Sequence, residues 1–541
     1  MKKKKRSHNL PKAERPKEEI KILRIWRHLL FAPGLIILLA LCLRLPNFTA
    51  SLWYDEVWHT YVGLQGSNFT QVLFHDVHPP LYPLFMRGWI ALFGDGEISM
   101  RTPSLLFGLA SIGMTYALAK NWFDQPVAIL SALLMALSPS HIWYSQEAKN
   151  NMLLLLLTLL ALWGLQQAWK TNRRSYWHLF ILATIFSLWT NHFALWALAA
   201  VLSWLWLQML TVNGRSRFYW IAVSTAVILL AYVPGLVMLL QNESLERGYL
   251  RPFTPLEIYN LFLIYLSHGN TLRTVFPWNI AKSIQSQAPA LFLLEIFFLL
   301  LLLRGAWSIG WSWWMRLKEK KESSAISGAG SELLLFCLVA PPVMLLAASV
   351  LRPHIYVERS MIFLLPPYLI VLAYGALSFQ RSNWRAVTAG MLLLLALTSL
   401  CNLWGPKAEA WTVWMPKPDW RATTSYFDRE IGASAEKFLI FQVNPETSLV
   451  YYYDRIIRSA NAGLPVSHPT TLPIIYLKKF TREEIDGYLA STGIRKVYFV
   501  HNHQWSGAFP LVMRAVQSDP QFRLTDAARF PGITVYRFAV P

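Results

Sequence analysis

The sequence predicts a polytopic α-helical membrane protein with a separate α/β domain at its C-terminal end. Apolar residues make up 54% of the 541 residues and charged residues only 15%, and the mean hydropathy is +0.33. A soluble chain of this length needs more charge to cover its surface. The apolar residues also cluster in long runs, such as 153–162, 291–303 and 391–400. Together these observations exclude a soluble multidomain protein.

Eleven segments are long and apolar enough to cross a bilayer, because a spanning helix needs about 20 mainly apolar residues. Any count from ten to thirteen fits the sequence, since the fifth and sixth segments nearly meet at residues 190–192. The predicted spans cover residues 28–46, 101–119, 126–143, 150–169, 176–192, 193–212, 218–240, 287–306, 332–351, 360–379 and 385–402.

The net charge of +20 is unevenly distributed along the chain. Residues 1–27 hold eleven Lys and Arg against three Asp and Glu, and we interpret them as a basic cytoplasmic tail. Much of the remaining positive charge falls in short loops on the same side of the predicted spans, as the positive-inside rule requires. This asymmetry argues against a nucleic-acid partner and predicts a cytoplasmic N-terminus.

Three extracytoplasmic pieces are too large to be simple turns. Outer loops 47–100 and 241–286 belong to the transmembrane region 28–402, and residues 403–541 form the predicted α/β domain. That domain has no Gly-rich phosphate loop, so we assign no chemistry to it. Its predicted elements are helices at 420–428 and 482–491 and strands at 437–443, 496–500 and 533–538.

Two adjacent carboxylates, Asp55 and Glu56, follow the first predicted span by only a few residues. Charge this close to hydrocarbon is expensive and tends to mark function. A carboxylate here either accepts a proton from a hydroxyl nucleophile, binds a divalent metal, or is a solvated loop acid. The spacing alone leaves these three readings open.

The segment His75-Asp76-Val-His78-Pro-Pro-Leu-Tyr82 follows in the same outer loop. Its spacing fits neither the usual zinc motifs nor a helical i, i+4 pair. The two prolines forbid a regular helix. We therefore expect a structured turn here and assign no metal ligand to it.

Two cations lie at span ends on the same predicted side of the membrane. Lys149, in Gln-Glu-Ala-Lys, precedes a nearly pure leucine span, where it either belongs to a helix cap or meets a lipid phosphate. Arg359 pairs with Glu358, extends to the interface, or holds a phosphate with its two-pronged guanidinium. Carboxylates and cations at one interface suit a phospholipid-linked substrate and a hydroxyl acceptor.

Four motifs follow one another along the chain. They are Asp55-Glu56, His78-Pro-Pro-Leu-Tyr82, Glu97-Ile-Ser-Met-Arg101-Thr-Pro-Ser and Ser145-Gln-Glu-Ala-Lys149. As an ordered set they resemble the bacterial branch of the dolichyl-phosphate-mannose protein mannosyltransferase family, to which the lipid A aminoarabinose transferase is related. The likeness runs through about the first 170 residues, with weaker echoes at 359–367 and 417–426. It implies a GT-C fold and an inverting transfer of a sugar from a polyprenyl-phosphate carrier to an acceptor hydroxyl. The resemblance places that transfer on the outer face of the bacterial inner membrane.

The resemblance also implies roles for single residues. In such enzymes the Asp of the first-loop pair is the presumed general base, here Asp55, and Glu56 would orient the acceptor or keep Asp55 ionised. His78 and Lys149 are expected near the donor phosphate, together with Arg359. Tyr82, Glu147 and Tyr356 complete the predicted substrate pocket.

One position departs from the pattern of the family. Relatives more often carry an Arg followed by a Tyr two residues on, whereas this chain has Lys149 and Asn151. Lys keeps the positive charge but lacks the two-pronged geometry of Arg. At this position the chain therefore offers a phosphate a single point charge in place of a two-pronged contact.

The expected partners are a polyprenyl-phosphate-linked sugar, membrane lipid, and a lipid, glycan or protein acceptor. No cofactor is required by the motifs, although a metal-dependent oligosaccharide transferase that uses Asp55 or His78 as a ligand stays an alternative. A transporter or lipid flippase is the rival from another class. Against it, the chain has no convincing internal repeat, and apart from Glu295 its span centres are nearly free of charge.

Overall fold

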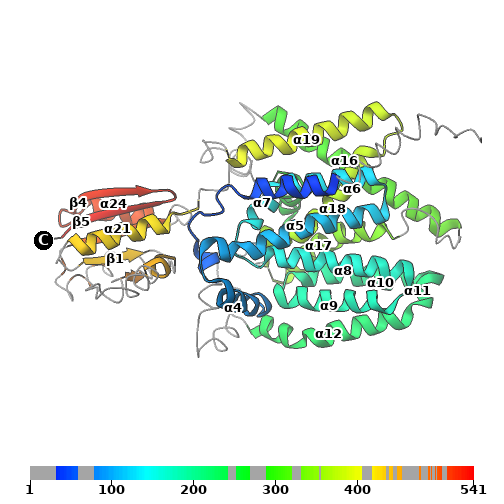
Figure 1. The fold of residues 1–541 in the computed structure, drawn as a ribbon, viewed down its shortest axis with the longest axis horizontal. Helices are drawn as coiled ribbons and strands as arrows, with labels where there is room; N and C mark the ends of the chain where they lie inside the picture. Colours follow the sequence, from blue (N-terminus) through cyan, green and yellow to red (C-terminus); the bar gives the residue numbers. More distant parts are fainter. Residues whose placement is uncertain are drawn as a thin grey trace, which may run out of the picture.

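In the computed structural model, the helical part of the chain forms a bundle, and a five-stranded sheet lies at one end of it (Figure 1). The predicted fold class is therefore confirmed. The predicted basic tail, residues 1–27, lies outside the described residues. The structure describes residues 32–58, 78–241, 252–268, 288–319, 330–352, 355–404, 417–433, 438–442, 448–453, 474–476, 485, 487, 489, 494, 496–502 and 509–540.

Each of the eleven predicted spans overlaps a helix. In the described part of the chain, seven helices are long and apolar enough to cross a membrane, and the bent pair α6–α7 makes an eighth. The other three predicted spans coincide with the shorter helices Ala32–Arg44, α9 and α10, so a count of eleven is not established. The helices are α4 (Leu81–Phe93), α5 (Glu97–Trp122), α6 (Gln125–Leu137), α7 (Pro139–Ser145), α8 (Asn151–Thr171), α9 (Arg174–Thr190), α10 (Ala194–Leu207), α12 (Phe218–Gln241), α16 (Ala288–Glu319), α17 (Glu332–Leu351), η4 (Glu358–Leu364), α18 (Leu365–Leu377) and α19 (Ser382–Trp404).

Helix α18, with its leading 3-10 turn η4, is the most buried of the apolar spans in the described residues. Helix α16 packs against it unusually closely. A Cβ atom at Gly305 would lie 2.2 Å from the carbonyl oxygen of Val371, and one at Gly375 would lie 2.0 Å from that of Leu301. Only glycine permits two helix backbones to approach this closely. The contact fixes α18 and therefore η4, which carries Arg359.

Helices α6 and α7 meet at a bend of 60°. Pro139 lacks an N–H group and begins α7, which suits the first turn of a helix. Helix α7 then packs onto α5 at Gly108, where a Cβ atom would lie 2.3 Å from Ser145 Oγ. After α7 the chain runs through a short connection, residues 146–150, before α8 begins.

The C-terminal sheet has the strand order β2-β1-β3-β5-β4. Strands β2, β1 and β3 are parallel, whereas β5 is antiparallel to both β3 and β4. Trp420 and Phe427 of α21 belong to the apolar cluster on one face, and Met513 and Val516 of α24 to the cluster on the other. The elements are α21 (Trp420–Ala433), β1 (Phe438–Gln442), β2 (Ile474–Tyr476), β3 (Lys496–Asn502), α24 (Phe509–Ser518), β4 (Arg523–Phe530) and β5 (Ile533–Ala539).

Four of the elements predicted for this region coincide with β1, β3, β5 and α21. Strands β2 and β4 and helix α24 were not predicted. The predicted helix at 482–491 lies almost entirely outside the described residues.

The C-terminal region contacts the first outer loop. The backbone N–H of Leu52 donates to the hydroxyl of Tyr452 over 2.7 Å. Arg421, at the start of α21, pairs with Glu97 at the start of α5 over 3.1 Å. These contacts link the sheet to the loop that carries Asp55.

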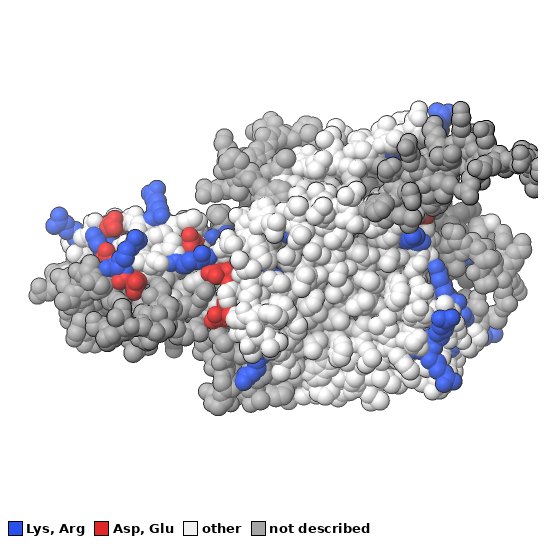
Figure 2. Space-filling model, viewed as in Figure 1, with Lys and Arg blue, Asp and Glu red and all other residues white. Residues whose placement is uncertain are grey.

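Charge on the visible face of the bundle is confined to its two ends (Figure 2). Lys and Arg gather at the end farther from the sheet, and both signs of charge occur near the sheet. A charge-free band between charged ends is the arrangement that a bilayer requires. The chain is a multi-pass membrane protein.

Candidate active site

Glu56 is a buried anchor for the first outer loop. Arg101 of α5 forms a two-pronged ion pair with it, over 2.7 Å from Nε and 2.8 Å from Nη2, and the backbone N–H of Ala148 donates to it over 3.0 Å. Burial alone would raise the pKa of the Glu56 carboxyl, but the charges of Arg101 and Lys417 and these hydrogen bonds lower it to about 2. The carboxylate thus stays ionised and joins the loop, α5 and the connection 146–150.

Arg101 also fixes the backbone just before the acidic pair. Its guanidinium donates to the carbonyl oxygens of Phe48 over 2.8 Å and Ser51 over 3.1 Å, as well as to that of Ala50. A fully buried arginine with every donor pointing at an acceptor holds a loop rigidly. This loop presents Asp55 to the site.

One carboxylate oxygen of Asp55 is shared by two cations. Lys149 Nζ and Arg359 Nη1 both donate to Asp55 Oδ2, the arginine over 2.9 Å. The Asp55 side chain is 15% exposed, so it remains accessible. Burial lowers the pKa of the Lys149 ammonium and the charge of Arg359 lowers it further, while the charges of Asp55 and Glu147 oppose both effects.

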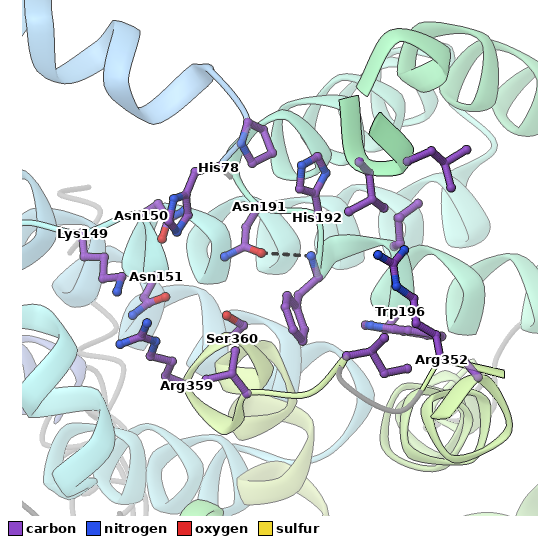
Figure 3. Close-up of a pocket in the computed structure, with 18 of the residues that line it drawn as sticks. His78, Lys149, Asn150, Asn151, Asn191, His192, Trp196, Arg352, Arg359 and Ser360 are labelled. Carbon is purple, nitrogen blue, oxygen red and sulfur yellow. Dashed lines mark hydrogen bonds between the residues drawn. The ribbon is translucent and has the colours of Figure 1, made fainter. Parts of the chain in front are cut away.

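A cavity of about 350 Å³ opens beside these two cations (Figure 3). Lys149, Asn151 and Arg359 lie at one end of it, and Trp196 and Arg352 at the other. Its walls come from the N-terminal turns of α8 and α10, the C-terminal turns of α12 and α17, and η4. The apolar part of the wall includes Leu195, Trp196, Leu239, Leu240, Leu351 and Ile355.

The two ends of the cavity suit different parts of one amphipathic ligand. An ammonium and a guanidinium side by side form a binding site for a phosphate. The leucine-lined end suits a hydrocarbon chain. A lipid phosphate with its head group at Lys149 and Arg359 would match both.

A second buried charge cluster lies behind the cavity. Glu147 accepts a hydrogen bond from Trp143 Nε1 over 2.5 Å, and burial raises its pKa to about 7 against the charges of Lys417 and Lys149. Lys417 reaches in from the segment before α21, donates to the carbonyl oxygen of Gln146 over 2.8 Å and lies over the Trp143 ring. Burial lowers the pKa of Lys417 to about 8, and the charge of Arg101 acts in the same direction.

The structure brings Asp55, Lys149 and Arg359 into contact and places His78 on the cavity wall. Asp55 contacts two of the lining residues but does not itself line the cavity. The other four predicted site residues, Glu56, Tyr82, Glu147 and Tyr356, are buried and do not line it either.

The polar residues near the site to which the sequence alone assigned no role include Asn150, Asn151, Asn191, His192 and Lys417. Two signals could have found four of them. Asn150 and Asn151 directly follow Lys149, and Asn191 and His192 are the polar break between two predicted spans. The position of Lys417 depends on how the C-terminal region docks, which no local pattern encodes.

The described residues do not offer a ligand set for a metal ion. No group of three or more His, Cys, Asp and Glu side chains with suitable spacing occurs among them. His75 and Asp76 lie outside the described residues. The Asp55 oxygen that faces Lys149 and Arg359 is already engaged by both cations.

Comparisons with known proteins bear on the family resemblance and on the fold. Residues 77–242 match the dolichyl-phosphate-mannose-protein mannosyltransferase family. The fold is similar to that of apo ArnT from Cupriavidus metallidurans, with a TM-score of 0.54, 12% identity, and coverage of 93% of this chain and 97% of that one. The chain has a GT-C fold.

Two further structures share this GT-C fold. One is the same ArnT bound to undecaprenyl phosphate, with a TM-score of 0.50, 14% identity and the same coverage. The other is the Archaeoglobus fulgidus oligosaccharyltransferase in complex with zinc and sulfate, with a TM-score of 0.51, 12% identity, and coverage of 93% of this chain and 72% of that one. A search of curated proteins found no match. The resemblance predicted from the four motifs is confirmed.

Proposed function

We propose that this protein transfers a sugar from a polyprenyl-phosphate carrier to an acceptor hydroxyl at the extracytoplasmic face of the bacterial inner membrane, with inversion at the anomeric carbon. The observation that carries the proposal is the shared Asp55 oxygen. A base and two phosphate-binding cations meet there, at one end of a cavity whose other end is mainly apolar and also includes Arg352. The GT-C fold and the mannosyltransferase match support the same chemistry.

In this proposal, donor binding frees the Asp55 carboxylate from its ion pairs so that it can act as the base. With its carboxylate paired to Lys149 and Arg359, Asp55 is a poor proton acceptor, because both cations stabilise its ionised form. In this proposal a donor phosphate competes with Asp55 for the same two cations. ArnT, which shares this fold, has been solved bound to undecaprenyl phosphate. Once Arg359 turns to the phosphate and the fixed Lys149 also pairs with it, Asp55 is released to accept a proton.

The transfer is a single displacement. The acceptor hydroxyl attacks the anomeric carbon, Asp55 takes its proton, and the bond from that carbon to the phosphate oxygen breaks. The polyprenyl phosphate leaves with the electron pair, and Lys149 and Arg359 stabilise the negative charge on it. His78, on the same cavity wall, assists in binding the phosphate.

Glu56, Tyr82, Glu147 and Tyr356 act indirectly in this scheme. Glu56 holds the loop that presents Asp55, since its carboxylate is engaged by Arg101 and by the N–H of Ala148. The other three are buried outside the cavity lining, so they do not contact a ligand in the cavity. In this proposal the C-terminal region, residues 403–541, lies on the extracytoplasmic side together with the site.

Mass spectrometry of lipid-linked sugars and envelope glycans, in cells with and without this protein, tests the proposal. We expect one sugar to disappear from its acceptor while its lipid-linked form accumulates. Unchanged glycans together with altered lipid distribution would favour a flippase instead. The anomeric configuration of the product, compared with that of the donor, tests inversion.

A metal-dependent variant of the reaction has its own test. The purified protein is assayed after exhaustive chelation, with a chelated sample restored by Mg²⁺ or Mn²⁺ alongside. Full activity without added metal supports catalysis by Asp55 and the two cations alone. Activity that returns only with metal would make Asp55 a ligand rather than the base.

A further inference from the structure

The polar end of the cavity contains two buried side-chain amides with unused hydrogen-bonding atoms. Asn150 and Asn151 are each 1% exposed and both line the cavity. Asn150 Nδ2 donates to the carbonyl oxygen of Thr190 over 3.0 Å, which leaves its Oδ1 atom as an acceptor. Within the described part of the chain, Asn150 Oδ1 and Asn151 Nδ2 have no hydrogen-bond partner.

Buried donor and acceptor atoms of this kind are unfavourable unless a ligand forms hydrogen bonds with them. A buried polar group without a hydrogen-bond partner destabilises the folded protein. Two of them on adjacent residues, one acceptor and one donor, therefore indicate a ligand that supplies both a donor and an acceptor. Figure 3 shows Asn150 and Asn151 on the cavity wall next to Lys149, with Arg359 close to Asn151.

A sugar hydroxyl meets that requirement better than a charged substituent does. A hydroxyl both donates and accepts, whereas an ammonium only donates and a carboxylate only accepts. An ammonium would leave Asn151 Nδ2 unpaired, and a carboxylate would face the oxygen of Asn150.

The charge of the cavity also disfavours a cationic sugar. Among the described residues that line it, Lys149, Arg352 and Arg359 are cations and none is Asp or Glu. Asp55, the carboxylate that meets this end, is paired with two of these cations. In the proposed reaction the released Asp55 serves the acceptor as the base, and no Asp or Glu among the described lining residues remains as a counter-ion for a sugar ammonium.

We infer that Asn150 and Asn151 bind hydroxyl groups of the donor sugar, and that the site selects an uncharged polyhydroxylated sugar over amino sugars and uronic acids. The inference rests on the proposed function, because it takes the donor phosphate to lie at Lys149 and Arg359. It makes the two asparagines determinants of sugar specificity at the donor step.

Donor binding to the full-length protein in lipid nanodiscs, without acceptor, tests this inference. The probes are undecaprenyl phosphate alone and the same lipid carrying a neutral hexose, a 4-amino sugar or a uronic acid. We expect the neutral hexose donor to bind at least tenfold more tightly than either charged donor. A wild-type protein that prefers either charged donor would overturn the inference without any variant being made.

Two variants sharpen the result. In the Asn150→Ala, Asn151→Ala protein the neutral hexose should lose its advantage, while undecaprenyl phosphate binds as before. In Asn151→Asp the new carboxylate should shift the preference at least tenfold toward the amino sugar. Asn121→Ala, which removes an amide bonded to Gln166 away from the cavity, is the matched control.

The outcomes separate the inference from the proposed function. If undecaprenyl phosphate itself fails to bind the wild-type protein, the phosphate site and the proposed function are wrong. If the lipid phosphate binds but the asparagine variants leave the preference among sugars unchanged, only the inference is wrong.

Discussion

The arginine that shares the Asp55 carboxylate is 31% exposed, whereas its lysine partner is 4% exposed. Arg359 can therefore rotate toward an incoming phosphate at little cost, while Lys149 is held in place by its surroundings. Asp55 lies between a fixed cation and a movable one. The proposed donor exchange depends on that difference.

Replacing Arg359 by Ala should weaken donor binding. The loss of one charge-assisted contact, worth about 1.5–3 kcal/mol, predicts a Kd for undecaprenyl phosphate higher by about tenfold or more. Isothermal titration or microscale thermophoresis on nanodisc-embedded protein measures it. The control is Arg385→Ala, an exposed arginine at the start of α19. Equal affinities in the two variants would remove Arg359 from the phosphate site.

Glu147 should make stability depend on pH. Its folded-state pKa is raised by burial from 4.5 to about 7, so the folded protein holds this proton more tightly than the unfolded chain does. The resulting stability is present below pH 4.5 and is lost as the pH rises through 7. Thermal unfolding at pH 5 and pH 8 should show a larger decrease in Tm for wild type than for Glu147→Gln. Parallel Tm profiles would contradict a raised pKa.

At the residue scale, the sequence predicted the three charged residues that meet in the site better than it predicted the residues around them. Asp55, Lys149 and Arg359 could be grouped because topology put all three on one side of the membrane. Tyr82 and Tyr356 shared that side, yet both are buried away from the cavity lining, because sidedness does not fix the direction of a side chain. Lys417 contacts Gln146 across 271 positions of sequence, and no pattern within either segment signals that contact.

The elements that matter most are the connection between α7 and α8 and the segment that leads into α21. The first carries Glu147, Lys149 and Asn150. The second carries Lys417, whose side chain lies buried next to Glu56 and Gln146. Lys417 Nζ lies 3.6 Å from Glu56 and its side chain is 6% exposed. The start of the C-terminal region is therefore part of the structure that holds Asp55.

Replacing Lys417 by Met should destabilise the protein far more than removing Arg421 nearby. Breaking a buried pair by removing one partner costs about 3–5 kcal/mol, and Glu56 keeps Arg101, so we expect a loss of about 3 kcal/mol. Arg421 is 52% exposed in its pair with Glu97, and an exposed pair contributes about 0–1 kcal/mol. Denaturant unfolding of Lys417→Met and Arg421→Ala measures both. Losses of equal size would show that Lys417 is not an anchor.

The helices were predictable because a run of about 20 apolar residues has few alternatives to a membrane span. The bend between α6 and α7 was not predicted, because the expected span 126–143 runs through Ser138-Pro139-Ser140-His141, the polar residues at which the helix bends. Strand β2 has three residues and β4 is largely exposed, so neither leaves a clear alternating pattern.

At the scale of the whole molecule, the sheet and the candidate site lie at one end of the bundle, and basic residues gather at the other (Figures 1 and 2). The positive-inside rule applied to this distribution gives an orientation with the sheet outside the cell membrane. That orientation would give the site access to extracytoplasmic acceptors.

Cysteine labelling tests this orientation. In a background without the three native cysteines, Gln517→Cys on α24 should react with a membrane-impermeant maleimide in intact spheroplasts. Arg385→Cys, at the start of α19, should react only after permeabilisation. The reverse pattern would place the site on the cytoplasmic side and refute extracytoplasmic transfer.

The Asp55→Asn protein tests the central claim most directly, with donor affinity and turnover measured on the same preparation. Removing the carboxylate frees Lys149 and Arg359 for the phosphate, so we expect undecaprenyl phosphate to bind several-fold more tightly, consistent with the loss of a competing charge-assisted bond. Removing the base should lower turnover by about 10²–10⁴-fold. Tighter donor binding with turnover lost is the predicted result; unchanged affinity, or turnover at the wild-type rate, would contradict it.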